Sequence, residues 1–167
     1  MLRRVDIDPS LAPAEVAGRV LNEFCAHALE SLPEECCGLL SGNALIRFRS
    51  VHRCRNEMTK MHQQDSHAFP RDGREAFYMN ELDYCRAKEN AALLDEIITA
   101  VYHSHVGYGA YFSEMDQEFA TNELFPFPGV EHIVISTIDR KVSQLGLFTW
   151  DLNAKVYVGR AIVPSVP

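Results

Sequence analysis

The sequence predicts an α/β fold in which helices flank a mixed β-sheet. Two segments, residues 13–31 and 80–95, carry apolar side chains at helical spacing, so each predicts an amphipathic helix. Residues 97–105, IITAVYHSH, are apolar on both faces, which is typical of a central strand. Three more strands are predicted near the C-terminus, at residues 132–137, 142–150 and 155–163. This order of elements favours one sheet with helices packed on it.

The N-terminal part predicts a short strand at residues 2–7, followed by the helix at residues 13–31. Either Asp8 or Ser10 is a suitable N-cap for this helix, and Pro13 is tolerated in its first turn. Pro33 ends it. The apolar stripe of the helix consists of Val16, Val20, Leu21, Phe24 and Ala28.

The middle of the chain predicts a hairpin, a long loop and the second helix. Two apolar runs, residues 35–40 and 44–51, flank Ser41-Gly42-Asn43 and predict the hairpin. Residues 53–75 are polar, contain Pro and Gly, and predict a long loop that is functional or mobile. Asn80 is the predicted N-cap of the helix at residues 80–95.

Composition limits both the size class and the function class of the protein. The 167 residues fit a single domain over residues 1–167, and the net charge of −7 offers no basic stripe for nucleic acid. No segment reaches the roughly 18 apolar residues of a membrane span, and no signal peptide is recognisable. Five cysteines, two of them adjacent (Cys36 and Cys37), suit disulfides poorly and predict a cytoplasmic protein.

The stretch VYHSHVGYGAYFSEMD, residues 101–116, gathers the residues that carry chemistry. His103 and His105 point to the same face of a strand, about 6–7 Å apart along the chain. Ser113 and Asp116 have the spacing of a capping box at the start of a helix over residues 113–124. Two histidines and one carboxylate give the three protein ligands of a catalytic zinc site, which keeps a fourth position for water.

Spacing alone leaves a plainer interpretation equally open. Paired histidines on a strand are often packed or surface residues, and Ser113 with Asp116 is also what an ordinary helix cap requires. A hydrolytic site needs in addition a group to stabilise the oxyanion, for which Ser113 is placed, and a proton carrier. The glutamates of PEECCGLL, residues 33–40, are candidates for the proton carrier.

The complete pattern resembles the signature of the JAMM (MPN+) metalloprotease family. His103-Ser104-His105 is followed after seven residues by Ser113 and after two more by Asp116. The upstream PEECCGLL resembles the P-x-E-x-C-G-L-L form of small bacterial members. This resemblance covers nearly the whole chain and implies an MPN/JAB-like fold, related to that of cytidine deaminases. It also implies that zinc binds His103, His105 and Asp116, that Glu35 rather than Glu34 moves the proton, and that Ser113 stabilises the oxyanion.

The resemblance implies a zinc-dependent peptidase or isopeptidase. Eukaryotic members cleave ubiquitin-like proteins from lysine, small bacterial relatives trim the C-terminus of ubiquitin-like sulfur carriers, and others occur in phage tail assembly proteins. The expected partner is therefore a peptide or the C-terminal tail of a ubiquitin-like protein, cut after Gly-Gly. Two residues depart from the family pattern, which usually has proline at the positions of Val106 and Phe112.

Two other function classes are weighed against this one. A non-catalytic MPN scaffold that binds protein partners normally lacks the metal ligands, which are all present here. A zinc deaminase requires H-x-E with P-C-x-x-C, and neither motif occurs.

Several further residues are given a structural interpretation at this stage. Cys36 and Cys37 are expected to be packed strand residues rather than ligands or a reactive pair. A second metal site would consist of His52, Cys54, His62, Asp65 and His67, but a solvated loop is the favoured interpretation. This loop is also a candidate cover for the substrate. His132 and Trp150 are expected to be structural, and His27 has no evident partner. Tyr108 and Tyr111 are equally suited to peptide contact and to packing.

Overall fold

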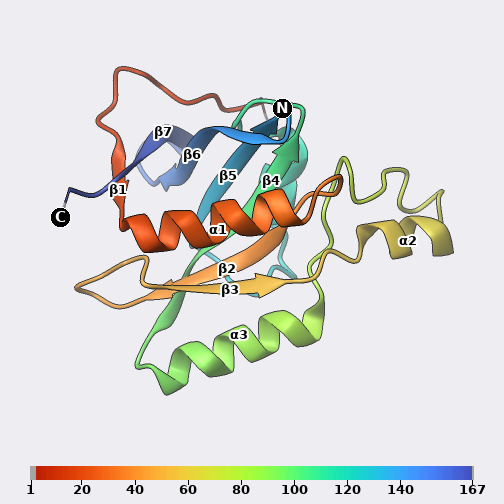
Figure 1. Cartoon of the computed structure of the whole chain (residues 1–167), viewed down its shortest axis with the longest axis horizontal. Helices are drawn as coiled ribbons and strands as arrows, with labels where there is room; N and C mark the ends of the chain where they lie inside the picture. Colours follow the sequence, from red (N-terminus) through yellow and green to blue (C-terminus); the bar gives the residue numbers. More distant parts are fainter. Residues whose placement is uncertain (1–2, 167) are drawn as a thin grey trace.

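A seven-stranded sheet runs through the molecule in the order β1-β7-β6-β5-β4-β2-β3 (Figure 1). The computed structural model describes residues 3–166. The strands are β1 (Ala14–Val16), β2 (Cys37–Gly42), β3 (Ser50–Cys54), β4 (Ile97–Val106), β5 (Glu131–Ile138), β6 (Lys141–Asp151) and β7 (Val156–Pro164). The helices are α1 (Gly18–Glu30), α2 (Met58–Gln64), α3 (Glu81–Leu93) and α4 (Glu114–Thr121). The described residues thus form one α/β domain; the predicted span of 1–167 also includes residues 1, 2 and 167, which lie outside them.

Strand β4 lies in the interior of this sheet. It pairs antiparallel with β2 and parallel with β5, so the sheet is mixed. Every residue from Ala100 to His105 is buried, because β4 has a strand on each side and other elements on both faces. The prediction of a central strand is confirmed.

The helices α1 and α3 cover opposite faces of the sheet. Leu40 and Tyr102 belong to the apolar cluster that contains Phe24 of α1. Their neighbours Leu39 and Val101 belong to a second cluster, which contains Ala87 and is contacted by Tyr84 of α3. Because side chains alternate along a strand, the two clusters lie on the two faces, and Figure 1 shows α1 and α3 on different sides of β2 and β3. His103 and His105 follow the alternation of Val101 and lie on the α3 side.

The predicted start of the first helix is wrong. Residues 14–16 form β1, which pairs in parallel with β7, and α1 begins only at Gly18 after the N-cap Ala17. Neither Asp8 nor Ser10 caps the helix, because the Asp8 carboxylate accepts hydrogen bonds from Ser10 in a local turn. Pro13 accordingly precedes the helix. Its buried stripe and its end before Pro33 are confirmed.

The predicted strand at residues 2–7 is also wrong as far as the structure describes it, from Arg3 onward. Val5 bridges to Phe112 and Ile7 bridges to Gly159, each as an isolated pair. Because these partners belong to different parts of the fold, no continuous ladder forms. Residue 2 lies outside the described residues.

The hairpin is confirmed, but its second strand is displaced along the sequence. β2 pairs with β3 from Cys37 opposite Cys54 to Ser41 opposite Ser50, and residues 43–49 form the connection. Leu45 and Ile46, which suggested a strand, are 93% and 49% exposed. The predicted long loop contains α2, a helix without a buried residue and therefore without an apolar stripe to reveal it.

The remaining elements agree with the sequence to within a few residues. The Asn80 side chain accepts a hydrogen bond from the Asp83 amide and caps α3, as predicted. Ser113 and Asp116 form the predicted capping box of α4, which ends at Thr121 rather than at residue 124. The three C-terminal strands are present as β5, β6 and β7. No helix within residues 3–166 has the length and apolar character needed to cross a membrane.

Candidate metal centre

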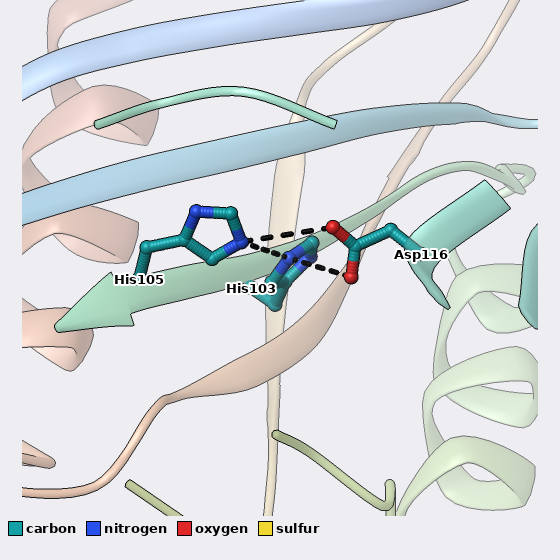
Figure 2. Close-up of side chains that lie close together, drawn as sticks. All are labelled: His103, His105 and Asp116. Atoms are coloured by element: carbon teal, nitrogen blue, oxygen red, sulfur yellow. Dashed lines mark hydrogen bonds and ion pairs between the residues drawn. The ribbon is translucent and has the colours of Figure 1, made fainter. Parts of the chain in front are cut away.

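His103, His105 and Asp116 converge at the end of β4 (Figure 2). The Nε2 atoms of the two histidines are 3.2 Å apart. The Asp116 oxygens lie 3.2 Å from His103 Nε2 and 3.6 Å from His105 Nε2. Within the part of the chain that the structure describes, this is the one group of histidine, cysteine or carboxylate side chains close enough to share a metal ion.

The loop between β4 and α4 is what returns Asp116 to the two histidines. Gly107 has a φ of +80°, a left-handed conformation that glycine adopts without strain, and its amide donates to Thr137 of β5. The Tyr108 carbonyl accepts from the Ser136 hydroxyl, and Phe112 exchanges hydrogen bonds with Val5. The loop is thereby held against the sheet, and α4 starts beside the end of β4.

The capping box then orients the Asp116 carboxylate. Its Oδ2 accepts from the Ser113 amide at 2.8 Å and from the Ser113 hydroxyl at 2.6 Å. The Ser113 oxygen in turn accepts from the Asp116 amide at 3.1 Å. The same two residues therefore begin the helix and direct a carboxylate towards the histidines.

The donor atoms fit the dimensions of a zinc site. Zinc binds imidazole nitrogen at about 2.0–2.1 Å and carboxylate oxygen at about 2.0–2.2 Å, so neighbouring ligand atoms of a tetrahedral site lie about 3.3 Å apart. The two Nε2 atoms are 3.2 Å apart, and two different Asp116 oxygens lie 3.2 and 3.6 Å from them, which is close to this spacing. One ligand atom from each of the three residues lies within 4.8 Å of the others. His105 Nδ1 lies 2.9 Å from the Gly109 carbonyl, which fixes the proton on Nδ1 and leaves Nε2 free to bind a metal.

The rings of both histidines are also held by packing. His103 stacks on Phe77 with ring centroids 4.8 Å apart, and His105 lies 4.7 Å from the ring of Tyr111. His103 Nδ1 has no hydrogen-bond partner among the described residues. The orientation of His103 therefore depends on these ring contacts, which makes Phe77 part of the site's support.

Asp116 is kept ionised by its neighbours. Burial alone would raise the pKa of this carboxyl, but the charges and hydrogen bonds of His103 and His105 lower it well below its usual range. The pKa of His105 is raised because Asp116 outweighs the effect of burial on the imidazole. The three side chains thus form a cluster with a carboxylate available as a ligand.

Glu35 lies beside this cluster, immediately before β2. The pairing of Cys37 with His103 and the hydrogen bond from the Ser104 amide to the Cys36 carbonyl place Glu35 next to His105 in the register. Glu35 is 6% exposed, and burial raises the pKa of its carboxyl to about 8 despite the opposing charge of His105. It lines the same cavity as His105, Ser113 and Asp116.

Glu34 is turned to a different environment. Its carboxylate accepts a hydrogen bond from the Thr59 hydroxyl, and it lines a separate depression beyond Cys36. The structure therefore brings together the five residues singled out from the sequence motif: Glu35, His105, Ser113 and Asp116 line the cavity, and His103 contacts His105 and Asp116. Glu34 does not line this cavity. The catalytic and ligand roles of those five residues stay predictions.

The cavity has a volume of about 760 Å³ and is lined by both charged and aromatic residues. Its apolar wall includes Phe77, Tyr84, Phe119, Phe125 and Phe127. Tyr108 and Tyr111 both line it, but Tyr108 is 57% exposed at the rim while Tyr111 packs between His105 and the guanidinium of Arg4. Such a cavity can hold an extended peptide tail that carries at least one apolar side chain.

The residues expected to be structural pack against other residues of the fold and do not belong to the ligand group. Cys36 and Cys37 are buried packed strand residues, and burial is the main cause that raises the pKa of both thiols. His132 is buried next to Phe112, and Trp150 packs on Tyr157. Phe112, which replaces a family proline, is fully buried in an aromatic cluster with Phe148 and Tyr157.

The contacts of His52, His62 and His27 test two further expectations, about a second metal site and about a partner for His27. The second group of candidate ligands is dispersed: His52 pairs with the Ser41 hydroxyl, and His62 Nδ1 lies 2.7 Å from the Phe69 carbonyl. The absence of a partner for His27 is wrong, because its Nδ1 lies 2.8 Å from the Tyr102 hydroxyl.

Sequence analysis did not identify Asn56, Arg71 or Phe77. Asn56 donates to the Glu35 carbonyl at 3.1 Å and thereby positions the residue before β2. Arg71 reaches the cavity from the predicted loop at residues 53–75, and Phe77 reaches it from just beyond that loop. No local motif distinguishes these three residues, since each acquires its place only through tertiary packing; the one available signal was the unusual length of the loop.

Comparison with known proteins gives the site a family. The CysO-cysteine peptidase of Mycobacterium tuberculosis (strain ATCC 25618 / H37Rv) is 31% identical over 121 residues, which cover 72% of this chain and 70% of that protein. The CysO-cysteine peptidase of Mycobacterium bovis matches over the same extent with the same identity. These matches support a peptidase of the JAMM type.

Two solved structures share the fold. Protein DSY2949 from Desulfitobacterium hafniense superposes with a TM-score of 0.63 at 20% identity, covering 90% of this chain and 92% of its own. A protein from Salinibacter ruber superposes with a TM-score of 0.61 at 23% identity, covering 92% of this chain and 93% of its own.

The family described as prokaryotic homologs of the JAB domain matches residues 17–152, a range that holds all five motif residues. The chain therefore belongs to the prokaryotic JAB family.

Proposed function

We propose that this protein is a zinc-dependent metallopeptidase that cleaves a peptide or isopeptide bond after the C-terminal Gly-Gly of a ubiquitin-like sulfur carrier. The observation that carries the proposal is the group of three suitable zinc ligands, two of which, His105 and Asp116, line one cavity together with the buried Glu35. Family membership and the peptidase relatives support the reaction type. The name of those relatives, which specifies CysO-cysteine, supports the choice of a carrier tail.

His103, His105 and Asp116 are the residues that would hold zinc. A zinc ion bound there supplies a Lewis acid, which polarises the scissile carbonyl and lowers the pKa of water towards neutrality. The ionised state of Asp116 and the fixed tautomer of His105 suit both residues to ligation without rearrangement.

Glu35 is the residue assigned to proton transfer. It takes one proton from the attacking water and delivers it to the nitrogen of the leaving group, so the products are a free amine and a carboxylic acid, which ionises by releasing the second proton of the water. Burial is the main cause that raises the pKa of Glu35 to about 8. A catalytic group transfers protons best when its pKa is close to the pH at which the enzyme works. Glu35 also lies immediately before β2, which pairs with the histidine strand β4, and it lines the same cavity as His105.

Ser113 is assigned to stabilisation of the oxyanion. Its hydroxyl donates to Asp116 Oδ2 at 2.6 Å in this structure, so donation to a substrate oxygen requires rotation about its Cβ–Oγ bond. The backbone of Ser113 is fixed by the capping box and does not need to move.

The test is incubation of the protein with ubiquitin-like carriers extended beyond Gly-Gly, followed by intact-mass analysis of the products. We expect the extension to be released by the wild-type protein and retained with Glu35→Gln. Cleavage of unrelated short peptides only, with every extended carrier left intact, would contradict the carrier part while leaving the peptidase part in place. Tight binding of carriers without any turnover would instead favour the scaffold alternative.

A further inference from the structure

The segment that follows α2 is attached directly to the backbone of Glu35. The carbonyl of Gly73 accepts a hydrogen bond from the Glu35 amide at 2.7 Å, and the Gly73 amide donates to Thr59 Oγ1 at 3.0 Å. A Cβ atom at Gly73 would lie 2.8 Å from Thr59 Oγ1 and 2.9 Å from Glu34 Cδ, so a side chain does not fit there. The position of this turn is therefore fixed relative to Glu35.

The same segment has a second anchor at Phe69. Its carbonyl lies 2.7 Å from His62 Nδ1, and its ring packs edge-on against Tyr78 at 6.0 Å. Tyr78 lines the cavity of the metal centre. Arg71 lies between the two anchors, so a side chain that extends from this short stretch is presented from a fixed backbone.

Arg71 is the only arginine or lysine that lines this cavity within residues 3–166. The other charged residues of the lining are the carboxylates Glu35, Glu75, Glu81 and Asp116, apart from His105. Arg71 is exposed and takes part in no ion pair within the described residues, whereas the nearby Arg74 pairs with Asp72 at 2.7 Å. The cavity is thus acidic except at Arg71.

The hydrogen bond between the Glu35 amide and the Gly73 carbonyl places Arg71, two residues before Gly73, near the Glu35 side of the cavity that both side chains line. Burial is the main influence on the pKa of Glu35 and raises it, while the charges of His105 and Arg71 lower it. In the proposed reaction Glu35 gives its proton to the leaving nitrogen. Groups beside Glu35 therefore face the leaving group rather than the carrier.

A leaving group that is one amino acid long carries its α-carboxyl carbon two bonds from the nitrogen that Glu35 protonates. A guanidinium beside Glu35 is then placed to bind that carboxylate with two parallel hydrogen bonds. A longer extension or a lysine-linked protein has an amide or a side chain at this position, which gains nothing from Arg71. The surrounding carboxylates also disfavour a second anionic group elsewhere in the cavity.

We propose that Arg71 is a specificity residue that binds the free α-carboxylate of a single amino acid on the leaving side, so that the enzyme acts as a carboxypeptidase on its carrier. This inference rests on the proposed function, and its new content is the assignment of leaving-group specificity to Arg71; a single amino acid attached to the carrier is already suggested by the name of the CysO-cysteine peptidase relatives. It also gives the long segment between β3 and α3 a role in recognition.

The experiment compares three carriers that differ only beyond Gly-Gly: one extra residue with a free carboxylate, the same residue as an amide, and an extension of several residues. We expect wild-type kcat/KM for the free acid to exceed that for the amide by about tenfold to a hundredfold. Arg71→Gln should abolish this preference, mainly through KM, and Arg71→Lys should keep part of it. The matched control is Arg74→Gln, which should retain the wild-type preference.

Equal kcat/KM for acid and amide in the wild type, or a preference that survives Arg71→Gln, would overturn the assignment while the proposed function stands. If no carrier is cleaved, the proposed function fails. The assignment of Arg71 is then tested by measuring the affinity of the protein for the three carrier tails. For that purpose the three tails are titrated calorimetrically into zinc-loaded Glu35→Gln protein with and without Arg71→Gln. Tighter binding of the acid that depends on Arg71 supports the carboxylate site, and equal affinities contradict it.

Discussion

The carboxyl of Glu35 is subject to opposing influences that suit it to proton transfer. Burial to 6% exposure raises its pKa to about 8, and the neighbouring charges of His105 and Arg71 limit the rise. Its backbone is fixed on both sides, by the Gly73 carbonyl and by Asn56. Glu34, one residue earlier, accepts a hydrogen bond from the Thr59 hydroxyl and does not line the cavity of the metal centre. This contrast provides a matched pair of variants.

The first prediction concerns turnover. Glu35→Gln should bind zinc and fold normally yet lose most of its activity, by about a hundredfold or more, because glutamine cannot carry the proton. Glu34→Gln should have a mild effect. Steady-state kinetics on an extended carrier, together with metal analysis, distinguish the two, and full activity of Glu35→Gln would refute the role of Glu35.

The second prediction concerns stability against pH in the metal-free protein. The pKa of Glu35 is about 8 in the folded protein and 4.5 as the ordinary value, so between these values the folded state binds more protons than the unfolded state. The stability from protonated Glu35 is therefore complete below the ordinary pKa and is lost as the pH rises towards 8. Glu35→Gln removes this dependence.

Urea unfolding in the presence of a chelator measures the effect. The free energy of unfolding of Glu35→Gln, relative to that of the wild type, should increase between about pH 5 and pH 8 by on the order of a few kcal/mol. Glu34→Gln should follow the wild-type curve. A difference between Glu35→Gln and wild type that stays constant over this range would show that the Glu35 pKa is not raised.

At the scale of elements, the site depends on connections between segments that are far apart in sequence. β2 and β4 supply Glu35 and the histidines side by side, and the loop after β4 returns Asp116 to them. Asn56, just beyond β3, joins a third segment: it donates to the carbonyls of Glu35 and Ala76 and accepts from the amides of Met58 and Tyr78. The cavity wall and the start of β2 are therefore coupled through one side chain.

The third prediction tests this coupling. Asn56→Ala removes five hydrogen bonds, the weakest of them to the Gly73 carbonyl at 3.5 Å, and leaves several partly buried backbone groups unpaired. This change should lower the free energy of unfolding by about 2–4 kcal/mol. The turnover number should also fall while zinc remains bound, because the backbone of Glu35 loses a support but the ligands do not. Asn90→Ala, on the exposed side of α3, is the control. Unchanged stability and turnover in Asn56→Ala would contradict the proposed support.

At the scale of the whole molecule, α1 and α3 enclose the sheet from opposite faces, and the candidate site opens on the α3 side. The features that sequence predicted correctly are local or strongly periodic. The stripe of α1, the alternation that puts His103 and His105 on one face, and the capping box of Ser113 and Asp116 are each written in a few neighbouring residues. The motif spacing then identified the five residues that the fold brings together.

The features that sequence missed depend on distant partners or lack a pattern. β1 exists because Ala14 pairs with Ile162 at the far end of the chain, which no local window reveals. α2 has no buried residue and hence no apolar period. Arg71 reaches the cavity only because Gly73 binds the Glu35 amide, so its position follows from tertiary contacts alone.

The most direct test of the central claim is a zinc titration of chelator-treated protein, with cleavage of an extended carrier as the readout. Activity should be absent without metal, rise with added zinc and saturate at about one zinc per chain, because His103, His105 and Asp116 form one three-ligand site. His105→Ala, titrated in parallel, should neither retain zinc nor recover activity. Full cleavage by the metal-free wild type, or equal zinc content and activity in His105→Ala, would contradict the account.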